Sequence, residues 1–438
     1  MSEITTSAKG RSWSGTVDYG PGELYAPTSI EQLQDLVART PRIRALGTRH
    51  SFSTVAASDA DLVSLHAMPA DMDFDTDAGT VRVGGGVRYG ELAQAAAKAG
   101  LMLPNFGSLP HISAAGASST GTHGSGVTNP ALAAGVRAIT LVTAEGDIVE
   151  LSREKDPDIF GGSVLALGSL GVMSHLVLDL VPVYEARQVV YLDLPAEQMT
   201  NETLIPLMGS SFSVSLFLNF DGHAAQVWVK QKVQADGSAA AGSDTVPTDA
   251  TSPFPDTLYG ATRATSHRHP ADEPAEACTD QSGLPGPALE RMPHFRLEFT
   301  PSSGAEVQTE YWLPLENLAP ALAALTGIAE KIQPLLIVSE IRSVAADELW
   351  LSPAHHRATA CVHFTWKQEP EAVEALLPEV EAVLAPFAAR PHWGKVHTFT
   401  HEALEPHYPQ MADFRALRER MDPKGKFANE YVDRLIGR

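Results

Sequence analysis

Apolar and polar positions along the first 185 residues follow the helical and the extended period in turn. Between 28 and 40, Ile30, Leu33 and Val37 fall on one face of a helix that Thr28 or Ser29 can cap. Apolar stretches bounded by glycine or polar turns predict strands at 41–47, 61–65, 80–86 and 172–184, a helix at 89–100 and a hairpin at 136–152. This part of the chain therefore predicts mixed α and β structure.

The pattern changes near residue 185. A hairpin is predicted at 212–233, with its turn at Asp221-Gly222. A second hairpin is predicted at 295–313, strands at 335–345 and 358–367, and helices at 315–332 and 371–388. Residues 234–292 are rich in Ser, Ala, Pro and Gly and predict a long irregular surface excursion. This part predicts an α+β layer, an antiparallel sheet covered by helices.

The composition excludes several classes of partner. The 438 residues are enough for two or three domains, and the net charge, 32 − 53 = −21, opposes binding to nucleic acid or to an anionic membrane. Two cysteines far apart in sequence, Cys278 and Cys361, argue against a disulfide framework and a Cys-rich metal site. The N-terminus has no apolar signal segment, and no apolar run approaches the ~20 residues of a membrane span. We expect a cytoplasmic protein.

Two glycine-rich segments are candidate ligand-binding loops. In VRVGGGVRYGEL, Gly84, Gly86 and Gly90 do not fit the spacing of a nicotinamide-dinucleotide motif, which favours a tight turn between a strand and a helix. In 105–126, small residues and hydroxyls dominate, so the backbone can approach an anionic ligand closely. A linker shares this composition, but the apolar residues within the segment argue against one. We predict a loop that cradles a ligand.

Polar side chains also alternate along the two strands predicted at 335–345 and 358–367. In the first strand, Glu340 and Arg342 share a face, and in the second, His363 and Thr365 do. One interpretation is a solvated face with an ordinary Glu–Arg ion pair. The other is a pocket that recognises hydroxyl groups, for which a carboxylate acceptor, a guanidinium donor and an imidazole are suitable.

Lys395 follows an aromatic-glycine pair in RPHWGKVHTF, which can hold its amine in a fixed and partly desolvated place. A buried lysine has a lowered pKa and can act as a base, whereas an exposed basic loop is the alternative. The pairs His267/His269 and His355/His356 lack the spacing and the carboxylate neighbours of a metal site, and we interpret them as surface residues. We predict no metal.

The stretch RALGTRHSFS, 44–53, ends a predicted strand on an unusually polar turn. Together with other segments, this stretch resembles the FAD-linked oxidases of the vanillyl-alcohol oxidase type, and most of all their alditol oxidases, with the sugar-lactone oxidases as cousins. The likeness runs from about residue 40 to the C-terminus. The segments that carry it are RALGTRHSF, VRVGGGVRYGEL, SLPHISAAGASSTGTHGSG, LGSLGVMSHLVLDLVP, MPHFRLEFTPSSGAE, SEIR, VHFTW, ARPHWGKVHTF and DPKGKFANEY.

The resemblance implies an α+β fold of two domains. An FAD-binding domain with two α/β subdomains, of the PCMH type, is expected at 1–185 and is completed by 396–438. A substrate or cap domain, the antiparallel sheet covered by helices, is expected at 186–395. The resemblance also implies FAD bonded through its 8α-methyl carbon to His50, with the pyrophosphate on turn amides. The other residues expected to contact FAD are Ala45, Leu46, Gly47, Thr48, Arg49, Ser51, Gly107, Ser108, Ser113, Gly116, Thr120, Gly121, Thr122, His123 and Val172.

The substrate site implied by the resemblance consists of Ser108, Glu340, Arg342, His363, Thr365 and Lys395. The expected reaction converts the terminal primary alcohol of an alditol such as xylitol or sorbitol to the aldose and reduces O2 to H2O2. Lys395, with His363 beside it, is expected to remove the hydroxyl proton, while Glu340, Arg342 and Ser108 orient the polyol. Gly107 matches a position where a small residue leaves O2 a path, which favours an oxidase over a dehydrogenase.

Two alternatives remain open at this stage. The same fold accommodates an aldonolactone (sugar-1,4-lactone) oxidase, although the SEIR and HWGK segments favour polyols. A flavin- or sugar-binding protein without turnover is the other, against which the intact candidate residues argue. The expected partners are a small polyol and O2, and the sequence is compatible with a monomer.

Overall fold

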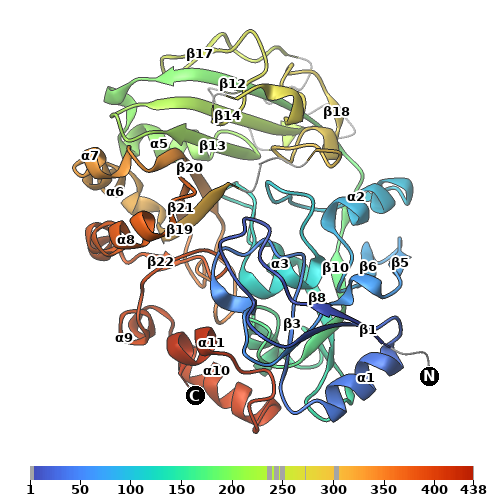
Figure 1. The fold of residues 1–438 in the computed structure, drawn as a ribbon. Helices are drawn as coiled ribbons and strands as arrows, with labels where there is room; N and C mark the ends of the chain where they lie inside the picture. Colours follow the sequence, from blue (N-terminus) through green and yellow to red (C-terminus); the bar gives the residue numbers. More distant parts are fainter. Residues whose placement is uncertain are drawn as a thin grey trace.

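The computed structural model describes residues 4–233, 239–240, 246, 252–271, 273–299 and 305–437. Two hydrophobic clusters dominate the described interior. One lies among the N-terminal sheets and the C-terminal helices, and the other lies beneath the large sheet formed by the middle of the chain. In Figure 1 the large sheet occupies the upper part of the molecule and the N-terminal sheets the lower part.

A small N-terminal sheet forms around the first predicted strand and helix. Its strand order is β1-β2-β4-β3, and the strand predicted at 41–47 is its edge strand. Ser29 caps the neighbouring helix by accepting a hydrogen bond from Gln32 N, and Leu33 and Val37 are buried as the apolar pattern predicts. The elements are β1 (Thr5–Ala8), β2 (Glu23–Ala26), α1 (Ile30–Arg39), β3 (Ile43–Ala45) and β4 (Asp61–Val63).

A second sheet, of five strands, has the order β5-β6-β10-β8-β9. The predicted hairpin at 136–152 is present as the antiparallel pair β8 and β9. The strand predicted at 172–184 is divided into β10 and the short β11, which pairs with β7. The elements are β5 (Met72–Asp75), β6 (Thr80–Gly84), α2 (Tyr89–Lys98), β7 (Leu101–Met102), α3 (Ala114–Thr120), β8 (Val136–Val142), β9 (Ile148–Ser152), α4 (Pro157–Ser163), β10 (Val172–Asp179) and β11 (Val181–Pro182).

The described residues between 185 and 391 form an eleven-stranded antiparallel sheet with helices on one face. Apolar side chains of that face, such as Ile341 and Phe364, pack with Leu322 of α6 and Leu377 of α8. The expected sheet covered by helices is therefore present (Figure 1). The elements are β12 (Glu185–Leu194), α5 (Asn201–Met208), β13 (Ser213–Leu218), β14 (Ala224–Val233), β15 (Ala239–Ala240), β16 (Thr257–Leu258), β17 (Ala261–Arg263), β18 (Gly286–Pro287), β19 (Glu306–Pro314), α6 (Leu318–Thr326), α7 (Ala329–Ile332), β20 (Leu336–Val344), β21 (Thr359–Lys367), α8 (Pro370–Leu384) and β22 (Arg390–Pro391).

Two sequence predictions in this region are wrong, and a third, the helix at 315–332, is correct in part. The second hairpin does not form, because β19 pairs with β21 and β22 while Phe295 makes only an isolated bridge to Cys278. The predicted helix at 315–332 is divided into a 3-10 turn (Leu315–Asn317), α6 and α7. The described parts of 234–292 are packed, not an irregular surface excursion, since β16–β18 extend the sheet and Cys278 is fully buried. Residues 234–238, 241–245, 247–251 and 272 lie outside the described part.

The C-terminal segment returns to the N-terminal sheets. Its helices are α9 (His401–Leu404), α10 (Met411–Met421) and α11 (Glu430–Ile436), and their apolar residues belong to the N-terminal hydrophobic cluster. The buried Arg44 donates to the Phe427 carbonyl, and Asn429 Nδ2 donates to the Val55 carbonyl at 3.1 Å. Within the described residues, no helix has the length and apolar character that crossing a bilayer requires.

Candidate active site

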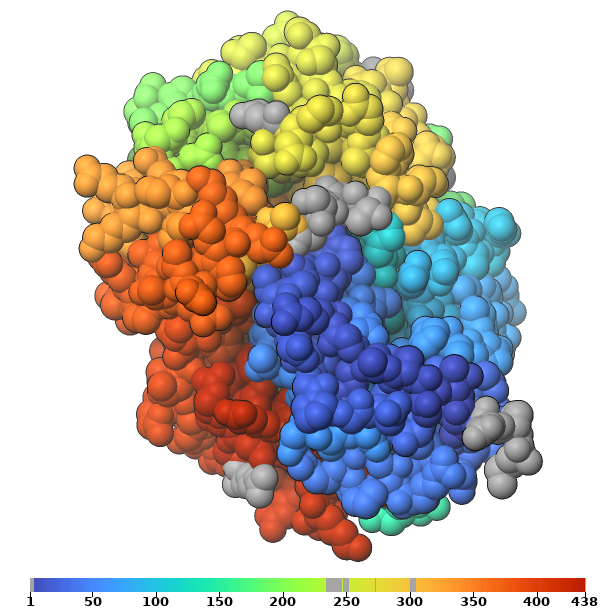
Figure 2. All heavy atoms as spheres, in the orientation of Figure 1, coloured from blue at the N-terminus to red at the C-terminus, as the bar shows by residue number. Residues whose placement is uncertain are grey.

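A cavity of about 1140 Å³ lies between the N-terminal sheets and the face of the large sheet that carries no helices. In Figure 2 the blue N-terminal region lies directly against the orange part of the large sheet domain. Hydrogen bonds join these regions beside the cavity: Phe52 N donates to Gly394 O at 2.7 Å, Ser53 N donates to the same oxygen at 3.3 Å, and Ser53 Oγ donates to Trp393 O at 2.7 Å. The site thus combines segments from opposite ends of the sequence.

The cavity gathers almost all of the residues that the sequence singled out. The substrate-site residues Ser108, Glu340, Arg342, His363, Thr365 and Lys395 line it, and so do Ala45, Leu46, Gly47, Thr48, Arg49, His50, Ser51, Ser113, Gly116, Thr120, Thr122, His123 and Val172. Gly107 and Gly121 are not among its lining residues. Gly107 instead borders a small apolar space with Phe106, Leu109 and Leu132.

Strand register places three ionisable side chains in one row across the sheet. Glu340 of β20 lies opposite His363 of β21, and His363 lies opposite Glu310 of β19. Directly opposed residues of neighbouring strands project from the same face. The alternate residues Ile341, Val362 and Tyr311 belong to the opposite, helix-covered face. The sheet therefore presents a polar face to the cavity and an apolar face to its helices.

Glu310 is the centre of this polar group and is fully buried. Its carboxylate accepts hydrogen bonds from Lys395 Nζ and, at 3.0 Å, from Arg342 Nη2, and it contacts His123 Nε2 and His363 Nδ1. Burial by itself raises the pKa of a carboxyl, but the charges of Lys395, His123 and Arg342 hold the pKa of Glu310 well below its usual range. Glu310 is thus a buried carboxylate compensated by cationic neighbours.

Lys395 extends from a tightly held loop. Trp393 Nε1 donates to Leu351 O at 2.7 Å, and the Gly394 carbonyl accepts from Phe52 N, so the residues before Lys395 are fixed on both sides. Lys395 Nζ lies 2.7 Å from His363 Nδ1. Burial lowers the pKa of Lys395 below its usual value, although the Glu310 charge opposes that shift. The lowered pKa makes the neutral amine, the form that can accept a proton, more accessible than in an exposed lysine.

Glu340 stands on the other side of Arg342. Arg342 Nε lies 3.6 Å from Glu340 Oε1, and His294 Nε2 lies 2.8 Å from the same oxygen. Burial raises the pKa of the Glu340 carboxyl, but Arg342 and His294 hold it well below its usual range. Arg342 also approaches Ser108, with Nη1 3.3 Å from its hydroxyl. The guanidinium thus connects both carboxylates to the loop at 105–126.

The turn at 44–53 closes the other end of the cavity. Arg49 has the left-handed value φ 67°, and a side chain on Gly47 would crowd Ser113 Oγ at 3.0 Å. His50 stacks on Trp13, with ring centroids 5.5 Å apart and an interplanar angle of 24°. Burial lowers the pKa of His50 to about 4, so its imidazole is neutral near pH 7. His50 Nδ1 is buried and has no hydrogen-bond partner among the described residues.

These features fit a flavin nucleotide. An elongated ligand can extend from the turn at 44–53 to the polar row of the large sheet, because one cavity joins them. Along this path, backbone segments pack closely against one another. A Cβ atom on Gly85 would overlap the Met173 carbonyl, and a Cβ atom on Gly86 would overlap the Leu65 carbonyl. The unpartnered atoms His50 Nδ1 and Ser113 Oγ lie at the same cavity. FAD therefore has a site of suitable size and polarity.

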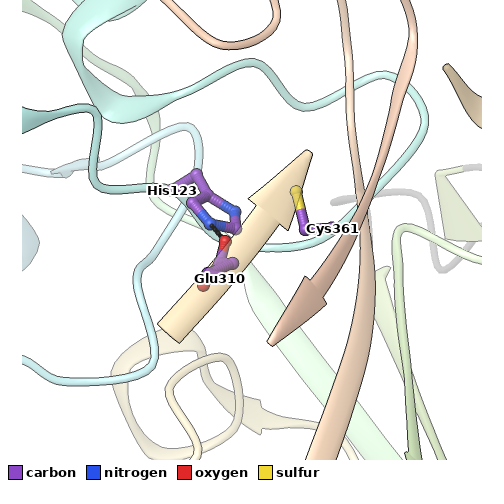
Figure 3. Close-up of side chains that lie close together, drawn as sticks. All are labelled: His123, Glu310 and Cys361. Carbon is purple, nitrogen blue, oxygen red and sulfur yellow. Dashed lines mark hydrogen bonds and ion pairs between the residues drawn. The ribbon is translucent and has the colours of Figure 1, made fainter. Parts of the chain in front are cut away.

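Three buried side chains, His123, Glu310 and Cys361, also lie close enough to one another to suggest metal binding (Figure 3). Both oxygens of Glu310 already contact nitrogen atoms, namely those of His123, Arg342 and Lys395. Burial raises the pKa of Cys361 well above its usual value, and Glu310 adds to this shift, which leaves a neutral thiol where a metal would need a thiolate. This chemistry favours an ion-pair cluster.

Two predicted surface residues are not on the surface. His269 is buried and lines the cavity, and His355 is buried beside its exposed neighbour His356. The spacing of these histidines argues against a metal site but does not determine whether the side chains are buried. Sequence reasoning also missed three residues of the site: Glu310, His294 and His392. For Glu310, the available signal was the alternation of Glu306, Gln308 and Glu310 in a strand whose second half is apolar.

Comparisons with known proteins agree with this geometry. The FAD binding domain family matches residues 21–152, and the D-arabinono-1,4-lactone oxidase family matches residues 305–435. Alditol oxidase of a Streptomyces species is 45% identical over 97% of this chain and 98% of the relative. L-gulono-1,4-lactone dehydrogenase of Mycobacterium tuberculosis is 27% identical over 97% of this chain and 98% of the relative.

Solved structures share the fold. A solvent-stable cholesterol oxidase superposes with a TM-score of 0.76, covering 99% of this chain and 98% of that one, at 16% identity. The expected FAD-binding fold with a separate substrate domain is thereby confirmed. The identity of 45% over nearly the full length of a relative is far above the level of shared fold alone. The chain belongs to the vanillyl-alcohol oxidase type family of FAD-linked oxidases, in its alditol oxidase group.

Proposed function

We propose that this protein oxidises the terminal primary alcohol of alditols such as xylitol and sorbitol to the aldose and reduces O2 to H2O2. The observation that carries the proposal is that Glu340, Arg342, His363 and Lys395 line the same cavity as the turn at 44–53. A substrate bound between them contacts a base, a guanidinium and a carboxylate at once. These are the groups that a chain of hydroxyls can satisfy.

Residues of the N-terminal region hold the cofactor in this proposal. The backbone amides of 47–51 bind its pyrophosphate, whereas the expected amide of Leu46 already donates to the Val63 carbonyl at 2.8 Å. The neutral His50 imidazole bonds covalently to the 8α carbon. The stacking of His50 on Trp13 fixes the orientation of the imidazole ring. Bound FAD supplies the acceptor for a hydride from the alcohol carbon and a route for the electrons to O2.

The protein's own part in the reaction is orientation and proton removal. Lys395 Nζ takes the proton of the hydroxyl being oxidised, and burial favours the neutral amine that this step requires. His363, 2.7 Å from Nζ, holds the amine in place, and Thr365 in turn contacts His363 Nε2 at 3.1 Å. Glu340 accepts a hydrogen bond from a second hydroxyl, and Arg342 with Ser108 positions the chain between them.

Gly107 is proposed to leave a path for O2 and not to bind the substrate. Because Gly107 borders the small apolar space beside the loop rather than the main cavity, it does not contact the polyol. A Cβ atom there would meet Thr122 Cγ2 at 3.5 Å, an ordinary contact. The absent side chain therefore leaves room rather than relieving a clash, in keeping with a path for O2. The proposal also includes a monomeric protein located in the cytoplasm. Both cysteines, Cys278 and Cys361, are free and buried, which agrees with a reducing compartment.

An aldonolactone oxidase is the second candidate, favoured by the lactone oxidase family match at 305–435. A peroxide assay over xylitol, sorbitol, mannitol, glycerol and a set of 1,4-lactones separates the two candidates. Alditols that yield peroxide, with lactones inert, support the proposal. Peroxide from lactones alone would overturn it. A yellow protein that yields no peroxide from either class would instead indicate a binding protein without turnover.

A further inference from the structure

A chain of three buried side chains leads from the interior of the sheet to the cavity. Lys230 of β14 is 1% exposed, and its Nζ donates to the Met292 carbonyl at 2.6 Å and to His294 Nδ1 at 2.8 Å. His294 Nε2 lies 2.8 Å from Glu340 Oε1. Of the three residues, His294 and Glu340 line the cavity, whereas Lys230 lies behind them.

The contacts with Glu340 and Lys230 together fix the tautomer of His294. The ionised Glu340 carboxylate can only accept, so the hydrogen between the two residues lies on His294 Nε2, and Nδ1 is left to accept from Lys230. Burial lowers the pKa of His294 to about 4, which makes the ring neutral and leaves its single proton on Nε2. That N–H donates to Glu340 Oε1. Rings of Phe217 and Trp228, with centroids 5.8 and 5.0 Å from that of His294, limit rotation of the imidazole.

The other oxygen of Glu340 is available to a ligand. Within the part of the chain that the structure describes, no residue donates a hydrogen bond to Glu340 Oε2. A carboxylate held through one oxygen presents the second as a fixed acceptor for a hydroxyl hydrogen. Arg342 lies between Glu340 and Glu310, the partner of Lys395, so this acceptor stands apart from the oxidised end of the substrate.

Burying a lysine here is costly without such a role. Desolvation penalises its charge, and the described residues place no carboxylate within ion-pair distance of Lys230 Nζ. Its acceptors are a carbonyl and an imidazole, both neutral. An apolar side chain of similar length would fill the same space between Trp228 and Met292 without that penalty. We therefore explain the buried amine by its hydrogen bond to His294 Nδ1, which holds the imidazole in place.

We propose that Lys230 and His294 are positioning residues that hold Glu340 as the acceptor for a substrate hydroxyl beyond the two carbons nearest the oxidised end. This inference rests on the proposed alditol substrate. A site built to bind a hydroxyl discriminates strongly against an analogue that lacks it, because the polar groups of the site are then left unpaired. Lys230 and His294 thus contribute to the selection of longer polyols over short diols.

The first test reads the tautomer directly and needs no turnover. Nitrogen-15 NMR of histidine-labelled holoenzyme, with the His294 signals assigned from a His294→Phe variant, should show a protonated Nε2 and an unprotonated Nδ1. Lys230→Met should perturb this pattern, and Lys230→Arg, which can still donate, should preserve it. A wild-type His294 protonated on Nδ1 overturns the inference, whether or not any variant folds.

The second test uses steady-state kinetics with xylitol and with 1,2-propanediol, which has no hydroxyl beyond its second carbon. Lys230→Met should raise KM for xylitol by about tenfold, corresponding to one lost hydrogen bond of about 1.4 kcal/mol, with kcat less affected and 1,2-propanediol unchanged. Lys232→Met is the matched control, since Lys232 lies half-buried on the same strand over the Tyr184 ring. An equal rise for both substrates, or no rise for xylitol, overturns the inference. If neither xylitol nor 1,2-propanediol is oxidised, the proposed function fails. The NMR measurement of the His294 tautomer is then the only test of the inference.

Discussion

Lys395 and Glu310 form an ion pair in which the carboxylate is fully buried and the amine is 13% exposed. The two residues are far apart in sequence: Glu310 lies on β19, and Lys395 lies in the loop after β22. Arg342 donates to the same carboxylate, so Glu310 faces two cations, while its contact with His123 is to a ring whose pKa burial lowers. The pair links the stability of the large sheet to the protonation state of the candidate base.

Replacing Glu310 by Gln is expected to destabilise the protein substantially. The amide keeps the shape but leaves Lys395 and Arg342 without their shared counter-charge in a buried place. Breaking a buried ion pair in this way typically costs about 3–5 kcal/mol of unfolding free energy. Urea unfolding of the holoenzyme measures the loss. Glu379→Gln, which breaks the exposed pair with Lys331, is the control and should cost less than about 1 kcal/mol; equal losses in both variants would contradict this account of Glu310.

The pH dependence of flavin reduction should follow Lys395. Proton removal needs the neutral amine, whose fraction rises as the pH rises through the pKa of Lys395. Since burial lowers that pKa below the usual 10.5, kcat/KM for xylitol should rise with pH and level off below pH 10.5. Glu310 raises the pKa of Lys395, so Glu310→Gln should move the midpoint to lower pH. A midpoint that stays in place, or moves upward, means that another group is titrating.

Replacing His50 by Ala should break the link between cofactor and chain. Wild-type protein denatured and separated on a gel is expected to show a fluorescent, yellow band. The His50→Ala band should be dark, with flavin recovered free in solution. His66→Ala is the control, because His66 also lines the cavity yet lies outside the turn. Fluorescence that survives in His50→Ala would place the attachment elsewhere.

The glycine run should tolerate no side chain at Gly85. A Cβ atom there would overlap the Met173 carbonyl, and backbone of a central strand cannot move aside at low cost. Overpacking of this kind typically costs about 1–3 kcal/mol, and Gly85→Ala should also weaken retention of FAD. Gly135→Ala, whose Cβ would meet nothing within 4 Å, should resemble the wild type in urea unfolding and flavin content. Matching behaviour of the two variants would show that the turn does not constrain the cofactor site.

Much of the fold was predictable because local patterns decide it. Ser29 as a cap, the turn at Asp221-Gly222 and the strand containing Glu340 all depend on neighbours within a few residues. The hairpin predicted at 295–313 failed for the opposite reason. Strand β19 pairs with β21, more than fifty positions further along the chain, and no local signal encodes that choice.

The candidate site divides in the same way. His50, Glu340 and Lys395 stand in short segments with a recognisable resemblance, so their place in one cavity could be expected. The alternation along β19 marks Glu310 as a polar position, but its role and that of Lys230 depend on strand register, which the sequence alone does not give. Glu310 matters only since β19 lies beside β21, opposite His363, and Lys230 only since the loop carrying His294 folds over β14.

The central claim is that Lys395 removes the proton from a polyol held against the flavin. Anaerobic mixing of the wild-type protein with xylitol should bleach the flavin absorbance. Lys395→Met should retain its yellow colour and its flavin content but bleach at least about 100-fold more slowly, the usual contribution of a general base. Bleaching of Lys395→Met at the wild-type rate, with flavin fully bound, would contradict the account.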